Sequence, residues 1–174
     1  MTQPSHDAFR ERFPTLFETQ KPRLERYLAR LSGEPQLAAD LAQEAFIKLY
    51  ERGESPDCPE AWLITVATNL FRNARSKESR RTRLLREAET GGDLRESSPS
   101  GLEGLSAAGD GRVRRAIETL SEREQSLLLL RTEGYSYREL ALALDLEESS
   151  VGTLLARAKR AFRAAYEEAH DARR

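Results

Sequence analysis

The sequence predicts an all-α protein with two small helical domains joined by a flexible linker. Apolar residues recur with helical spacing in both halves of the chain, and no segment alternates apolar and polar residues as a strand does. Six of the ten glycines lie between residues 87 and 111, together with Pro99 and several serines, a composition typical of flexible linkers. We therefore expect domains at 1–86 and 112–174 and a linker at 87–111.

Composition excludes several classes of protein. The only cysteine is Cys58, and His6 and His170 lie at opposite ends, so neither a disulfide framework nor a metal site is expected, and no cofactor is predicted. No run of eighteen apolar residues and no basic-then-apolar signal pattern occurs. These observations predict a cytoplasmic protein without membrane insertion.

The charges are sorted along the chain, although the net charge is only -1. The segment from Leu63 to Arg86 has seven basic residues and one acid, which favours contact with phosphates. The segment from Glu34 to Glu60 has seven acids and two basic residues. Adjacent segments of opposite charge indicate two different partners.

The first helical segment contains an apolar series from Phe9 to Leu31, which Pro14 and Pro22 are expected to break into two pieces. These apolar residues are predicted to be core.

A second helix is predicted from Pro35 to about Tyr50, since proline suits a first helical position. Its inner stripe consists of small and apolar residues: Ala38, Leu41, Ala42, Ala45 and Leu49. The opposite side has Asp40, Gln43, Glu44 and Ile47. An isoleucine among acids is either a stray apolar residue on a solvated face or part of a partner surface.

A third helix is predicted from Pro59, with two faces of different chemistry. The inward face has Leu63, Val66, Ala67, Leu70 and Ala74, and the other has Trp62, Thr65, Asn69, Arg72, Asn73 and Ser76. Amides bond base edges, arginine holds phosphate, and an aromatic ring stacks on an unpaired base, so this face suits single-stranded or opening DNA. The alternative is a core tryptophan beside solvated arginines.

The segment from Ser136 to Arg163 has the layout of a helix-turn-helix. Capping boxes at Ser121/Glu124 and Ser136/Glu139 predict two helix starts. In the last helix one side has Ser150, Thr153, Arg157, Arg160 and Ala164, and the other has Val151, Leu155, Ala158 and Phe162. One face is thus predicted to pack and the other to read duplex DNA.

Three motifs together resemble the extracytoplasmic-function (group 4) sigma-70 factors of bacterial RNA polymerase. They are D-x-x-Q-E-x-F from Asp40 to Phe46, PEAWLITVATNLFRN from Pro59 to Asn73, and the terminal helix-turn-helix. The resemblance implies an alternative sigma factor. Its first domain would be region 2, which docks on the clamp helices of core polymerase and captures the melted -10 element. Its last domain would be region 4, which binds the polymerase flap and reads the -35 element.

The resemblance also implies roles for individual residues. Core polymerase would contact Asp40, Gln43, Glu44, Phe46 and Ile47. The -10 DNA would contact Trp62, Asn69, Arg72, Asn73, Arg75, Ser76 and Lys77, with a flipped base held by the loop from Arg52 to Cys58. The -35 bases would face Ser150, Thr153 and Arg157, with Lys159 and Arg160 nearer phosphates.

Four positions depart from the family pattern. Asn73 stands where many members have aspartate, and Leu154 and Gly152 stand where many have basic residues. Asp145 replaces the common turn glycine, which is tolerable because aspartate adopts left-handed geometry more readily than most residues. The reading helix is therefore expected to have less positive charge than usual.

Two other classes of protein share parts of this pattern. A helix-turn-helix regulator that never touches polymerase would have no use for the acidic D-x-x-Q-E-x-F helix, and a serine recombinase would need strands in the first half. The resemblance implies a binding protein without chemistry of its own, and an anti-sigma factor as a further partner. The terminal residues 167–174 are expected to be a frayed helix end.

Overall fold

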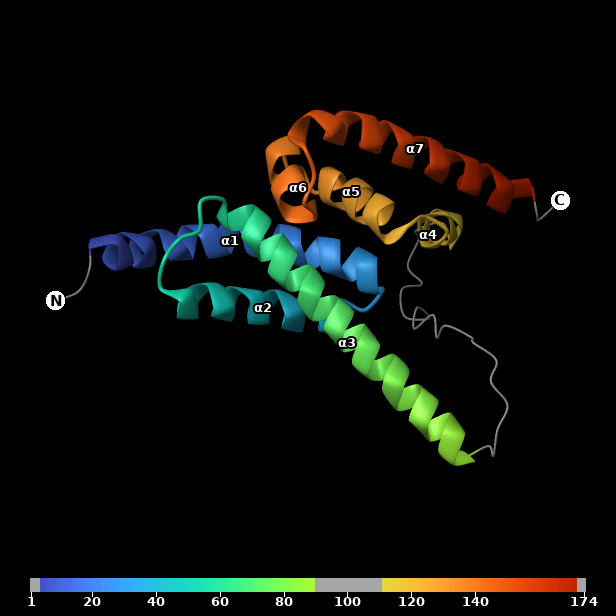
Figure 1. Ribbon diagram of the computed structural model, residues 1–174, viewed down its shortest axis with the longest axis horizontal. Coiled ribbons are helices and arrows are strands. Elements are labelled where there is room, and N and C mark those ends of the chain that lie inside the picture. Colours follow the sequence, from blue (N-terminus) through green and yellow to red (C-terminus); the bar gives the residue numbers. More distant parts are fainter. Residues whose placement is uncertain (1–3, 90–110, 172–174) are drawn as a thin grey trace.

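The structure is a computed structural model that describes residues 4–89 and 111–171, and within these ranges it contains seven α-helices and no strand (Figure 1). The helices are α1 (Pro4–Ser32), α2 (Pro35–Arg52), α3 (Pro59–Glu89), α4 (Gly111–Glu118), α5 (Glu122–Thr132), α6 (Tyr137–Leu144) and α7 (Glu148–Asp171). The all-α prediction is confirmed. Residues 90–110, most of the predicted linker, lie outside the described residues.

Helices α1, α2 and α3 form the first domain, in which α2 and α3 both pack against α1. As predicted, α2 begins at Pro35 and α3 at Pro59. Gly53 ends α2 in the left-handed region (φ 75°), where a side chain would be strained, and its N–H bonds to the carbonyl of Tyr50. The predicted inner stripe of α2 is buried against α1 and α3. The acidic face therefore points outward.

The predicted break of the first helix is wrong, because α1 runs without interruption from Pro4 to Ser32. Proline has no N–H, so Pro14 and Pro22 leave the carbonyls of Arg10 and Glu18 without a helical hydrogen bond. All four residues are exposed. These positions thus lie on the solvent side of α1, while its apolar side stays packed on its neighbours. Tertiary packing offsets the local cost of the two prolines.

Helices α4 to α7 form the second domain, and its local geometry follows the sequence closely. Both predicted capping boxes are present, at Ser121/Glu124 and Ser136/Glu139. Asp145 adopts the left-handed conformation (φ 53°, ψ 61°) between α6 and α7. The helix-turn-helix thus forms as predicted.

The two domains pack directly on each other. Helix α5 contacts α1, and α6 contacts α3, so buried apolar residues of both domains form one continuous cluster. Figure 1 shows α5 and α6 lying against the α1 and α3 side of the first domain, with α7 outermost. The relative placement of the domains therefore decides which faces of α1 and α3 are open.

The capping box at Ser136 can be tested by substitution. Ser136→Ala should lower the free energy of unfolding by about 1 kcal/mol, because the N–H of Glu139 loses its acceptor at the start of α6. Ser136→Asp should retain most of that stability, since aspartate is also a good N-cap. Urea denaturation followed by circular dichroism measures both; equal losses in the two variants would contradict the capping role.

Candidate polymerase and nucleic-acid interfaces

The outer face of α2 is an exposed surface that combines acids with apolar side chains. Asp40, Gln43 and Glu44 are exposed, and Ile47 is 48% exposed. Sequence reasoning missed Tyr50, which is 47% exposed and lies one turn beyond Ile47. Its position three residues after Ile47 could have predicted this, because residues three apart lie on the same side of a helix. We call Asp40, Gln43, Glu44, Ile47 and Tyr50 the α2 face.

Tyr50 is held in place from α1. Its ring meets the ring of Phe13 edge-on at 5.2 Å between centroids, and the guanidinium of Arg10 lies 5.8 Å from its centroid. These contacts keep an exposed aromatic ring fixed beside Ile47. A rigid apolar pair among acids is suited to docking on a protein surface.

Phe46 does not belong to this surface, which corrects its predicted role as a polymerase contact. Its side chain is only 2% exposed, and its ring lies edge-on to those of Phe13 (6.2 Å) and Phe17 (4.9 Å). The position at the end of the acidic motif places it on the inner side of α2. Phe46 fixes α2 on α1 and acts on the α2 face only through that packing.

The polar face of α3 is exposed over most of its length. Asn69, Arg72, Asn73, Arg75, Ser76 and Lys77 are all exposed. Trp62 is half-buried and packs against the core. It is therefore partly a core residue and partly exposed beside the polar face. The amide oxygen of Asn69 accepts a weak hydrogen bond from Arg72 at 3.5 Å.

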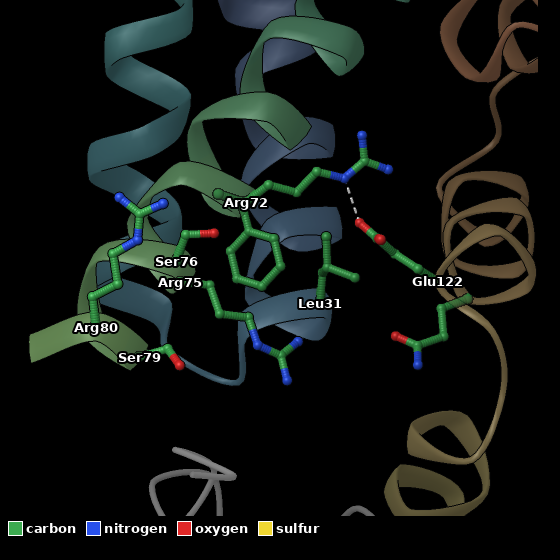
Figure 2. Close-up of a pocket in the computed structure, with 9 residues that line it drawn as sticks. Leu31, Arg72, Arg75, Ser76, Ser79, Arg80 and Glu122 are labelled. Atoms are coloured by element: carbon green, nitrogen blue, oxygen red, sulfur yellow. Dashed lines mark hydrogen bonds and ion pairs between the residues drawn. The ribbon is translucent and has the colours of Figure 1, made fainter. Parts of the chain in front are cut away.

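An open pocket of about 620 Å³ lies beside this face, between α3 and α5 (Figure 2). Two apolar residues, Leu31 of α1 and Phe71 of α3, line part of it, and Glu122 and Gln125 close the side toward α5. The polar residues of its α3 wall are Arg72, Arg75, Ser76, Ser79 and Arg80. Ser79 and Arg80 were not among the predicted -10 contacts. The basic segment in which they lie could have indicated them. Three guanidinium groups and two hydroxyls form a surface that suits phosphate.

The loop between α2 and α3 is held by short-range polar contacts. Arg52 bonds Glu54 at 3.1 Å, and the thiol of Cys58 donates to Glu60 at 3.7 Å. Burial raises the pKa of the Cys58 thiol above its ordinary value, so the thiol stays protonated at neutral pH. The thiol is therefore not an activated nucleophile.

The reading face of α7 is fully open. Ser150, Thr153, Arg157, Lys159 and Arg160 are exposed, whereas Val151, Leu155 and Ala158 are buried on the other side. The separation of faces predicted from the helical wheel is thus observed.

One of the two departures in the reading helix, Leu154, has a structural reason. Leu154 is half-buried and packs against the core, which is why an apolar side chain is accommodated where relatives have a basic one. A Cβ at Gly152 would lie 3.6 Å from the ring of Tyr137, in ordinary contact. Nothing in the structure explains the glycine at position 152.

Neither a membrane-spanning helix nor a metal site occurs among the described residues. None of the described helices combines the length and apolarity needed to cross a membrane. Among the same residues, no three His, Cys, Asp or Glu side chains are grouped so that they could hold a metal ion.

Comparison with known families decides the identity of the chain. Residues 16–81 match the family "Sigma-70 region 2", and residues 110–162 match "Sigma-70, region 4". The chain belongs to the sigma-70 family. The two matches agree with the extracytoplasmic-function type of sigma factor that the resemblance implied. A helix-turn-helix regulator without a polymerase-binding domain would lack the region 2 match.

A solved structure supports the fold. This sigma factor is similar to the sigma factor RpoE from Bartonella quintana, crystallised with the anti-sigma factor NepR, with a TM-score of 0.61. The sequences are 20% identical, and the match covers 89% of this chain and 96% of that chain. The two-domain helical architecture is therefore shared.

In this sigma factor, region 4 covers part of the polar face of α3. Arg72 forms an ion pair with Glu122 at the start of α5. The hydroxyl of Thr65 lies 3.3 Å from the carbonyl of Ala143 in α6. The pocket in Figure 2 is thus bounded by both regions, and Arg72 already has a carboxylate partner.

Substitutions can distinguish the role of the buried Phe46 from that of the exposed Ile47. Phe46→Ala should lower the free energy of unfolding by about 3–5 kcal/mol, because it removes a buried ring. Ile47→Asp should change that free energy by no more than about 0.5 kcal/mol, because the side chain is half exposed, yet it should weaken binding to core polymerase. Urea denaturation and a polymerase pull-down measure the two effects. Comparable destabilisation by both substitutions would contradict the assignment of the two faces.

Proposed function

We propose that this chain, an alternative sigma factor for transcription initiation whose partners are core RNA polymerase and promoter DNA, uses three separate surfaces. The α2 face docks on the clamp helices of core polymerase, α3 captures the melted -10 element, and α7 reads the -35 element. The proposal depends on one observation, that the exposed acidic and apolar face of α2 precedes an exposed basic face on α3. Surfaces of opposite character suit a protein partner and a nucleic acid, respectively.

The proposed mechanism needs binding alone. Region 4 fixes the position of the protein on the -35 duplex through Ser150, Thr153 and Arg157, with Lys159 and Arg160 near phosphates. The α3 face then binds unpaired -10 bases, which shifts the opening equilibrium toward the melted state. Contacts of about 1–3 kcal/mol per stacked base are sufficient to shift it strongly.

Several finer assignments belong to the same proposal. The division of the chain is 1–86, 87–111 and 112–174, the sigma factor has no catalysis of its own, and it works in the cytoplasm beside polymerase. The loop from Arg52 to Cys58 receives a flipped -10 base. The relative from Bartonella quintana was crystallised with an anti-sigma factor, which supports a similar partner for this chain.

A reconstituted reaction tests the function directly. Core polymerase with the purified chain should give transcripts from specific start sites on a genomic DNA library, whereas core polymerase alone should not. Transcripts indistinguishable from those of core polymerase alone would overturn the proposal.

The α2 face can be tested by charge reversal. Glu44→Lys should impair association with core polymerase while the helical content stays unchanged, because Glu44 is exposed and its ion pair with Lys48, at 3.5 Å, lies within α2 itself. Glu18→Lys, an exposed reversal on α1, is the matched control. A polymerase pull-down in which Glu44→Lys and the control bind alike would count against the clamp assignment.

The reading face can be tested with two arginines of the same helix. Arg157→Ala should weaken promoter binding by about 1–3 kcal/mol and relax the preference at one -35 position. Arg163→Ala removes the same charge from a different side of α7 and should change binding less. Fluorescence anisotropy and in vitro selection measure both; equal effects of the two substitutions would remove Arg157 from the reading face.

A further inference from the structure

The last part of α3 extends beyond the core of region 2 and has an uncovered pair of leucines. Phe71 is the last residue of α3 that belongs to the hydrophobic core cluster. Leu84 is 61% exposed and Leu85 is 53% exposed, although both side chains are large and apolar. Figure 1 shows this end of α3 projecting away from α1 and α2. An exposed apolar pair on a helix segment without tertiary support indicates a docking surface.

Two arginines share one side of this helix with the leucines. Leu84 follows Arg80 by four residues and Arg81 by three, and Leu85 follows Arg81 by four. Arg80 also lines the pocket beside α5, and Arg81 lies 4.0 Å from Glu78 in an exposed ion pair. We call Arg80, Arg81, Leu84 and Leu85 the α3 end. Because it combines positive charge with apolar area, a phosphate group alone does not match it.

The α2 face has the opposite charge and an apolar pair of its own. Ile47 and Tyr50 are about half exposed, and the acids Asp40 and Glu44 lie beside them. Glu51 is also exposed, and its position four residues after Ile47 adds a third acid on the same side of the helix. The α2 face and the α3 end are therefore opposite in charge, and each has two exposed apolar side chains.

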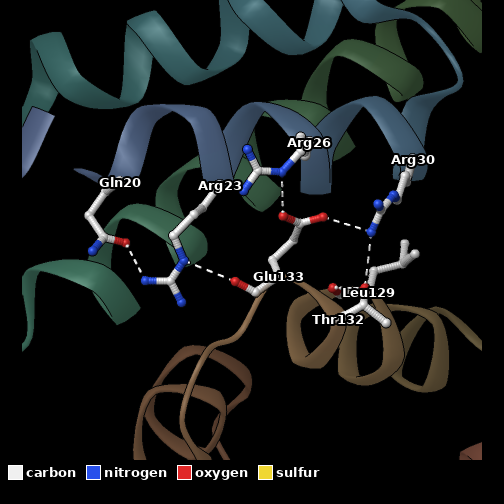
Figure 3. Close-up of polar contacts among 7 residues, drawn as sticks. All are labelled: Gln20, Arg23, Arg26, Arg30, Leu129, Thr132 and Glu133. Carbon is white, nitrogen blue, oxygen red and sulfur yellow. Dashed lines mark hydrogen bonds and ion pairs between the residues drawn. The ribbon is translucent and has the colours of Figure 1, made fainter. Parts of the chain in front are cut away.

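The arginines of α1 are a second basic surface, but region 4 of the same chain already covers them (Figure 3). Nε of Arg26 donates to one carboxylate oxygen of Glu133 at 2.7 Å, and Nη1 of Arg30 lies 2.7 Å from the other oxygen. Nε of Arg23 donates to the backbone carbonyl of Glu133 at 3.0 Å. In the described part of the chain, no acid of another helix pairs with the α3 end in this way.

One chain cannot bring its own two surfaces together. Leu84 lies 25 residues after Pro59, which is about 38 Å along an uninterrupted helix at about 1.5 Å per residue. Tyr50 lies near the start of α3, because only the six residues 53–58 separate α2 from α3. Since a continuous helix cannot fold back on itself, the α3 end can reach an α2 face only on another chain.

We propose that chains of this sigma factor associate head to tail, with the α3 end of one chain on the α2 face of a second copy. The leucines of the α3 end pack on Ile47 and Tyr50, and its arginines lie beside the surrounding acids. Because the two surfaces differ, the contact is heterologous, and a chain that has lost one surface can still use the other. The contact also excludes core polymerase from the α2 face, a consequence that rests on the proposed function.

Sedimentation equilibrium of the full chain tests whether the chains associate. The weight-average mass should rise above that of one chain as the protein concentration increases from about 1 µM to about 1 mM. Treatment of the protein with nuclease beforehand excludes chains that are bridged by DNA bound to their basic faces. A mass equal to that of one chain at every concentration would overturn the proposal.

Charge swaps identify the two surfaces. Arg80→Glu with Arg81→Glu makes the α3 end acidic, and Glu44→Lys with Glu51→Lys makes the α2 face basic. Each double variant alone should stay monomeric, because surfaces of like charge then meet. An equimolar mixture of the two should associate again, because every contact regains one acidic and one basic surface. Association of either variant alone as strong as that of the wild type, or a mixture that stays monomeric, would contradict the proposed pairing.

Two further variants separate the contact from effects of net charge. Arg123→Glu with Arg138→Glu makes the same change in charge on exposed arginines of region 4 and should associate like the wild type. Leu84→Ser with Leu85→Ser keeps every charge and should raise the dissociation constant about tenfold. Circular dichroism should show unchanged helical content, since all four side chains are exposed. Loss of association in the region 4 control, or none in the serine variant, would overturn the proposal.

The two proposals fail in distinguishable ways. Sedimentation is measured without polymerase or DNA, so it reports on the contact between chains alone. Transcription by core polymerase with the wild-type chain tests the sigma activity separately. Association of the chains together with failed transcription would leave the contact established and the proposed function refuted.

Discussion

The pairing of Glu133 with the arginines of α1 is the interaction on which the observed arrangement of the molecule depends. A nearly buried carboxylate is tolerated between the domains only because Arg26 and Arg30 lie against it. That pairing places α5 on α1 and α6 on α3. It thereby decides that Arg72 meets a carboxylate, whereas the reading face of α7 stays open.

Each helix that is assigned a partner has one side that packs in the core and another that is exposed. In α2, α3 and α7 one stripe is apolar and buried, and the remaining surface differs in charge: acidic on α2 and basic on α3. Because the buried stripes fix the helices, the outer faces need only present side chains. The proposed sigma function thus uses three chemically distinct outer faces on helices that the core holds in place.

Features set by neighbouring residues were predictable from the sequence. The starts of α2 and α3 at prolines, the two capping boxes and the left-handed Asp145 were all correct, because each depends on residues within one helical turn. The break in α1 was wrong, since tertiary packing outweighs the local effect of two prolines. Phe46 follows Ala42 by one turn, so helical spacing alone could have placed it on the inner side of α2. Leu154 could be placed only once the positions of neighbouring helices were known.

The sequence by itself determined the fold class, the family and the chemistry of each candidate surface, because helical periodicity and local charge need no knowledge of distant contacts. The tertiary structure alone decided which surfaces are covered. Arg26 and Glu133 are separated by 107 positions, and each resembles an ordinary surface charge in the sequence. Their pairing depends on how the two domains pack on each other, which periodicity within one helix cannot predict.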